Sequence, residues 1–224
     1  MKNLIIPMLI VLMMFQNCVP ANKGLIPDET AQQIFTPAEL KGLDEMIRFV
    51  DSKVAENKSL TDVNQVYRAY FDQFSSSVSG GKMFPALLTD SVKFKFLETL
   101  GKESFSSVWK LDDHVQMVRY KDTTLTDLHD FKTLGINNQG KYLRYLKEIG
   151  KSDSLYSHLY KSMETAGDIP PSVVGWYPAQ HKEIDFTLFK NRLWAAVFLL
   201  RMGDPLEERV EKYLKEKSLA ADKF

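Results

Sequence analysis

Residues 193–200 read LWAAVFLL, a run of eight consecutive apolar side chains. A helix that is apolar on every side is buried on every side, so this run predicts the central helix of a helical core. Lys190, Arg192 and Arg201 flank it. The run is also far shorter than the roughly 20 apolar residues that a membrane-spanning helix needs. It therefore indicates a packed interior rather than a membrane anchor.

Amphipathic segments on either side of this run predict further helices. Thr36, Pro37 and Glu39 form a start signal, because Thr36 can cap the helix, Pro37 suits its first position and Glu39 completes a capping box. Asp204, Pro205 and Glu207 would begin the last helix in the same way. We predict an all-α fold: one compact domain over residues 35–224 made of about three αα-hairpins. The hairpins would cover residues 36–77, 141–165 and 185 onward, and their unequal lengths argue against a solenoid.

The segment over residues 82–139 has no clear periodicity, and we expect it to be an irregular middle region. Residues 92–100 have a helical pattern that meets Gly101. Residues 115–120 alternate in a way that is compatible with a short strand, and residues 127–134 are compatible with a brief helix.

The composition excludes several classes of protein. Of the 224 residues, 44% are hydrophobic and 26% are charged, which is typical of a folded protein and not of a disordered one. Lys and Arg total 29, as do Asp and Glu, so the chain has no net charge with which to attract nucleic acid. The single cysteine excludes an internal disulfide and a thiolate-rich zinc site.

Residues 1–17 are typical of a signal peptide. Lys2 supplies a positive charge, and residues 4–15 form an apolar run interrupted only by Pro7. We therefore exclude this segment from the fold prediction.

Cys18 directly follows the apolar run, after Phe15, Gln16 and Asn17. This arrangement resembles the lipobox of bacterial lipoproteins, in the relaxed form of Bacteroidota, and the resemblance covers only the first 18 residues. It implies that Cys18 is acylated and becomes the mature N-terminus, with residues 18–34 as a lipid-anchored tether. Two alternatives stay open: ordinary cleavage after Ala21, which would give a soluble periplasmic or secreted protein, and an unmodified cysteine.

Polar clusters offer few candidates for chemistry. Asp113 next to His114 could form an acid–base pair or supply metal ligands, and His129 has the same potential with Asp130. Because adjacent side chains rarely point at one atom, we interpret both clusters as solvated turns. No hydrolase, phosphate-binding or metalloprotease motif is present in the sequence. We predict no cofactor and no metal site.

The best candidate for ligand binding is the segment with Trp176, Tyr177, His181 and Glu183, where aromatic and titratable groups occur together on a predicted loop. The alternative interpretation is a packed loop that covers the helical core.

From these observations we expect a non-enzymatic exported lipoprotein at the cell envelope. A lipid anchor would hold it on a membrane, and its helical domain would bind a protein or small-molecule ligand but no nucleic acid. The competing hypothesis is an exported hydrolase that uses His181 with Glu183, or Asp113 with His114.

Overall fold

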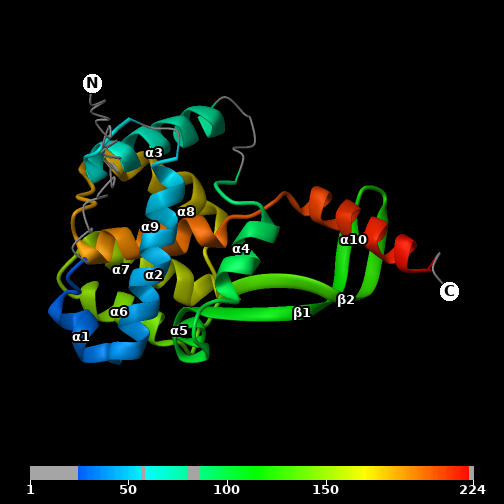
Figure 1. Ribbon diagram of the computed structural model, residues 1–224, viewed down its shortest axis with the longest axis horizontal. Coiled ribbons are helices and arrows are strands. Elements are labelled where there is room, and N and C mark those ends of the chain that lie inside the picture. The colour runs from blue at the N-terminus through cyan, green and yellow to red at the C-terminus, as the bar shows by residue number, and fades with distance from the viewer. Residues whose placement is uncertain (1–24, 57–58, 80–85, 222–224) are drawn as a thin grey trace, which may run out of the picture.

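The computed structural model describes residues 25–56, 59–79 and 86–221 (Figure 1). Within them the chain forms ten α-helices, one 3-10 helix and a two-stranded antiparallel sheet. The elements are α1 (Glu29–Ile34), α2 (Pro37–Val54), α3 (Val63–Ser79), α4 (Asp90–Leu97), α5 (Lys102–Val108), β1 (Trp109–Tyr120), β2 (Thr123–Ile136), α6 (Lys141–Ile149), α7 (Ser154–Ala166), α8 (Pro171–Trp176), η1 (Tyr177–Glu183), α9 (Phe189–Arg201) and α10 (Leu206–Ala221).

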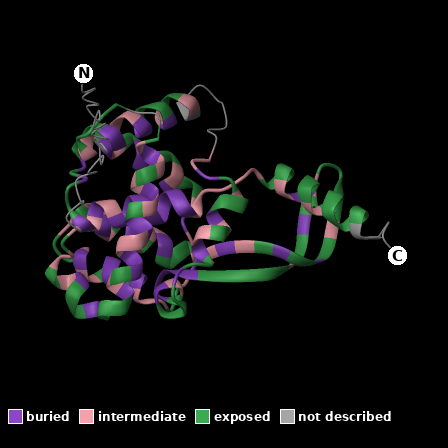
Figure 2. Ribbon diagram, in the orientation of Figure 1, coloured by how far each residue is buried: buried purple, intermediate pink, exposed green. Residues whose placement is uncertain are grey.

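The apolar run at residues 193–200 is the buried centre of the helical body, as predicted. All eight side chains belong to α9 and are at most 1% exposed. α2 packs against α9 and crosses it, and further helices of the body lie around them (Figures 1 and 2).

The predicted start signal of α2 is confirmed, and α7 has equally local signals at both of its ends. Thr36 Oγ1 accepts a hydrogen bond from the backbone N–H of Glu39, and the Glu39 carboxylate accepts one from the N–H of Thr36, which completes the capping box of α2. Asp153 caps α7, which ends at Gly167 with a φ of 74°, a backbone conformation that suits glycine.

The predicted all-α class is right only in its coarse form, because the middle region holds a long β-hairpin. β1 and β2 pair over 12 and 14 residues, with Trp109 opposite Ile136 at one end and Tyr120 opposite Thr123 at the other. The brief helix expected at residues 127–134 is therefore wrong. Threonine and valine side chains on these strands favour extended backbone, and pairing along the full hairpin outweighs the short helical pattern. We call residues 109–136 the arm.

The expected pairing of the last two helices is also not what the fold uses. α10 leaves the body and crosses the far end of the arm (Figure 1). Its Val210 is fully buried against Val118, Leu128 and Phe131 of the arm, in a second small core separate from the main one. The sheet, and not α9, thus covers Val210 and part of Tyr213, while Leu206 and Leu214 of the same helix stay exposed, so three αα-hairpins do not describe the domain.

The N-terminal boundary of the folded domain differs from the predicted one. Residues 29–34, which we expected to belong to the tether, form α1, capped by Asp28 and with Ala31 and Ile34 buried. Tyr145 donates a 2.5 Å hydrogen bond to Asp28, which fixes this segment to α6. The signal peptide, Cys18 and the tether up to residue 24 lie outside the described residues. None of the described helices is both long and apolar enough to cross a bilayer.

Candidate functional site

The predicted ligand-binding segment divides between the surface and the core. Trp176 at the end of α8 and Glu183 at the end of η1 line an open groove of about 420 Å³. Tyr177 and His181 are only 1% and 3% exposed and do not line it. They pack inward, which matches the alternative interpretation for these two residues.

His181 is a structural histidine in this fold. Its Nδ1 lies 2.6 Å from the carbonyl oxygen of Pro178, and its Nε2 lies 2.9 Å from Oδ1 of Asp72 in α3. Both ring nitrogens thus face oxygens inside the protein, and the residue is only 3% exposed, so the ring does not reach the groove. It joins η1 to α3 instead.

Four elements supply the walls of the groove, which we call the Trp176 groove. They are the N-terminus of α7, the end of α8, η1 with the link after it, and the first turn of α9. Sequence reasoning found two of its residues; the others are Asp153, Ser154, Leu155, Gln180, Ile184, Asp185, Leu188, Lys190 and Asn191.

The link between η1 and α9 is held in place by α3. Asn64 donates a 3.1 Å hydrogen bond to Oδ1 of Asp185 and accepts a 2.6 Å bond from the N–H of Phe186. The backbone N–H and the hydroxyl of Thr187 also donate to Asp185. These hydrogen bonds, that of the Thr187 backbone foremost, lower the pKa of the Asp185 carboxyl below its ordinary value.

The opposite wall of the Trp176 groove is tied together by a second set of polar contacts. Lys190 Nζ lies 2.7 Å from Oδ2 of Asp153, which also caps α7. Asn191 accepts a 2.5 Å hydrogen bond from the Tyr156 hydroxyl and donates a 2.7 Å bond to the carbonyl of Asp185. The groove is therefore framed by side chains whose own hydrogen bonds fix their positions.

The charge of the Trp176 groove is acidic. Asp153, Glu183 and Asp185 contribute three carboxylates and Lys190 one ammonium group, which is already paired with Asp153. Glu183 is exposed and has no hydrogen bond or ion pair to another side chain in the described part of the chain. Its carboxylate is therefore available to bind a ligand.

A larger groove, of about 570 Å³, lies between α2, α3 and α9. Its central charges satisfy each other, because Arg192 binds both carboxylate oxygens of Asp51, and the Tyr67 hydroxyl donates a 2.7 Å bond to the same carboxylate. This groove therefore offers a ligand fewer unpaired polar groups than the Trp176 groove does.

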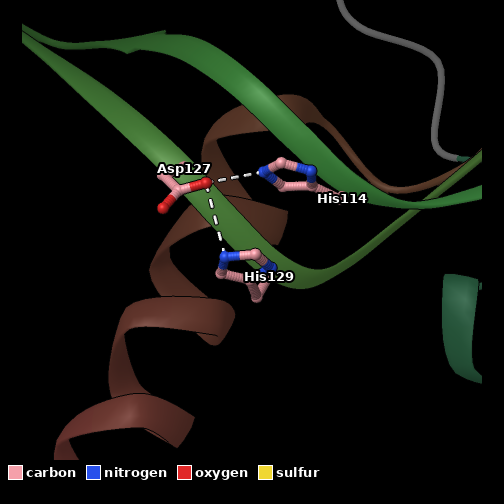
Figure 3. Close-up of side chains that lie close together, drawn as sticks. All are labelled: His114, Asp127 and His129. Carbon is pink, nitrogen blue, oxygen red and sulfur yellow. Dashed lines mark hydrogen bonds and ion pairs between the residues drawn. The ribbon is translucent and has the colours of Figure 1, made fainter.

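The two histidine clusters expected to be separate solvated turns meet on the arm. His114 of β1 is paired directly with His129 of β2, and both rings point at the carboxylate of Asp127 (Figure 3). Asp130 is instead paired with Lys217 of α10, at 2.9 Å. All three residues of the cluster are exposed, as expected of a surface hairpin, but their convergence was not predicted.

No protein-family model, curated protein or solved structure matches this chain.

The assignment of a functional site therefore depends on the chemistry of the groups that converge. The Trp176 groove offers an indole, a free carboxylate and two leucine side chains in one concave surface. A groove lined by an indole and a carboxylate is a combination that attracts organic cations.

Proposed function

We propose that this chain is an exported, lipid-anchored protein of the cell envelope whose domain binds a small organic cation in the Trp176 groove and performs no catalysis there. The observation that supports ligand binding is the presence of Trp176 and the unpaired Glu183 carboxylate in one groove. The support for the anchor is the position of Cys18 directly after an apolar leader.

The groove suits an amine with a short carbon chain. An ammonium group over an indole face gains about 0.5–2 kcal/mol from the ring quadrupole, depending on how far it is desolvated. Glu183 would add a charge-assisted hydrogen bond. Leu155 and Leu188 offer apolar contact for the carbon chain of the same ligand.

The competing hydrolase hypothesis has less support. His181 uses both ring nitrogens inside the protein, and it is buried away from the groove that Glu183 lines. His114 faces Asp127 and not its sequence neighbour Asp113. Neither predicted acid–base pair is thus assembled in the way that the hydrolase hypothesis needs.

Binding in the groove is tested by following the indole N–H resonance of Trp176 in ¹⁵N-labelled protein, assigned with Trp176→Phe. We expect cadaverine to shift this resonance, and glucose and succinate to leave it unchanged. Glu183→Gln should weaken cadaverine binding about tenfold, or roughly 1.4 kcal/mol. Glu216→Gln, at an exposed position on α10, is the matched control and should have no effect. A shift by glucose, or equal affinity in Glu183→Gln, would contradict a cation site.

Lipid anchoring is tested separately in living bacterial cells. We expect radiolabelled palmitate to be incorporated into the protein, and Cys18→Ala to abolish the label. A mature N-terminus at Asn22, or the product in the cytosol with Met1 intact, would show that the chain is not a lipoprotein.

A further inference from the structure

The antiparallel register of the arm places three potential metal ligands together. Side chains of directly opposed residues lie on the same face about 4.5–5.5 Å apart at Cβ, and residues two apart on one strand share a face. His114 is opposed to His129, and Asp127 precedes His129 by two residues. The imidazole rings are stacked, with centroids 4.5 Å apart and planes 10° apart.

The ligand atoms of these three side chains converge on a small volume. Oδ1 of Asp127 lies 2.8 Å from Nε2 of His114 and 3.3 Å from Nε2 of His129 (Figure 3). One such atom from each residue lies within 4.8 Å of the other two.

The two separations from Asp127 are close to what one ion requires. Zinc binds imidazole nitrogen and carboxylate oxygen at about 2.0–2.2 Å, so two ligands of a tetrahedral zinc ion are about 3.3–3.4 Å apart. The Asp127–His129 separation already has this value, and the Asp127–His114 separation would need to open by only about half an ångström. Small side-chain rotations on an exposed surface supply such a change.

We infer that His114, Asp127 and His129 form a binding site for a divalent transition-metal ion, with Zn²⁺ the best match. Two imidazoles and one carboxylate suit zinc and its neighbours in the first transition row, whereas Mg²⁺ and Ca²⁺ prefer oxygen ligands alone. The three side chains are 40%, 69% and 65% exposed, so water would complete the coordination. The ion would join β1 to β2 across the arm.

The backbone around the site is unusual for a plain hairpin. The register shifts between Asp112 and His114, and Asp127 and Asp130 adopt positive φ values of 60° and 66°. Aspartate tolerates this conformation better than most residues. Asp130 therefore provides a matched control for Asp127: it is the same residue type, with the same backbone conformation and on the same strand, but its carboxylate binds Lys217.

The test is a calorimetric titration of the full-length protein, purified in detergent and treated with a chelator, with ZnCl₂ and with MgCl₂. We expect binding of one Zn²⁺ per chain and no binding of Mg²⁺. His129→Gln and Asp127→Asn should each weaken zinc binding at least about tenfold. Asp130→Asn and His158→Gln, which alters a histidine outside the arm, should leave it unchanged.

Imidazole ¹⁵N spectra provide a readout that does not depend on the heat of binding. Zinc should move the Nε2 resonances of His114 and His129 and leave those of His158 and His181 in place. Because His129→Gln or Asp127→Asn could disturb the hairpin, each variant is interpreted only if amide exchange on the arm is unchanged. The inference would be overturned by zinc binding that survives both ligand variants, by equal binding of Mg²⁺, or by the absence of binding at millimolar zinc.

Discussion

Arg192 of α9 and Asp51 of α2 form a two-point ion pair at the junction of the two central helices, with Nε and Nη2 of the arginine each bound to one carboxylate oxygen. Their side chains are only 13% and 17% exposed. Tyr67 of α3 donates its hydroxyl to the same carboxylate, so one aspartate connects three helices.

Removing that aspartate should destabilise the whole domain. Asp51→Ala leaves the mostly buried guanidinium of Arg192 without its partner, which costs roughly 3 kcal/mol of the free energy of unfolding. Asp44→Ala is the matched control on the same helix. It breaks the more exposed pair with Arg48 and should cost about 0.3–0.5 kcal/mol. Urea denaturation of both variants measures the two costs, and equal values would contradict the role of Asp51.

Gly140, between β2 and α6, should not accept a side chain. A Cβ there would lie 2.5 Å from the carbonyl oxygen of Ser107 and 2.9 Å from that of Asn137, both backbone atoms. Gly140→Ala is expected to cost roughly 1–3 kcal/mol, because the start of α6 would have to move away from the end of α5. A Cβ at Gly175, within α8, meets nothing within 4 Å, and Gly175→Ala should stabilise the helix by up to about 1 kcal/mol. Thermal unfolding of both variants distinguishes them, and a neutral Gly140→Ala would show that the contact is not restrictive.

Truncating a side chain in the small core shared by the arm and α10 should destabilise both of them. Val210→Ala removes apolar contact with Val118, Leu128 and Phe131 and should cost roughly 1.5 kcal/mol locally. We expect faster amide hydrogen exchange on residues 115–131 and on α10, with exchange of α9 unchanged, because the two cores are separate. Leu214→Ala alters a side chain that is 40% exposed on the same helix and should change little. Acceleration throughout the body would mean that the two cores unfold as one.

Lowering the pH should destabilise the folded domain, in part through protonation of Asp185. Its pKa is lowered in the folded state by hydrogen bonds from Thr187 and Asn64, so its contribution to stability is complete above the ordinary aspartate pKa near 3.8 and is lost as the pH falls through the lower folded value. Asp185→Asn should therefore reduce stability at neutral pH and flatten the loss below about pH 4. Chemical denaturation at a series of pH values measures both effects. If the stability of Asp185→Asn falls with decreasing pH as steeply as that of the parent protein, other carboxyl groups account for the acid sensitivity.

The sequence signals that predicted helices correctly all act between residues that are close together in the chain. Thr36 and Glu39 lie three residues apart and complete each other's hydrogen bonds, so their positions in the chain are enough to predict the start of α2. The run at residues 193–200 needs only its own composition to indicate burial. The alternation at residues 115–120 did indicate part of β1, but the sequence did not predict β2 or the length of the arm, because pairing depends on a partner up to 27 residues away, as with Trp109 and Ile136.

The candidate sites likewise combine residues that are close in the sequence with residues that only the fold brings together. Trp176 and Glu183 could be chosen from the sequence because they lie within one segment, but Asp153, Lys190 and Asn191 reach the same groove from other helices. His114 and His129 were each visible as histidines beside aspartates.

Taken by itself, the sequence determined where α2 begins and that the run at residues 193–200 is buried, because capping and local composition act between residues close together in the chain. Tertiary structure alone decided that α10 covers the arm, that Tyr177 and His181 face the core, and that Asp127 stands between two histidines. Those outcomes depend on strand register and on apolar surfaces from distant parts of the chain, which become neighbours only when the whole domain packs.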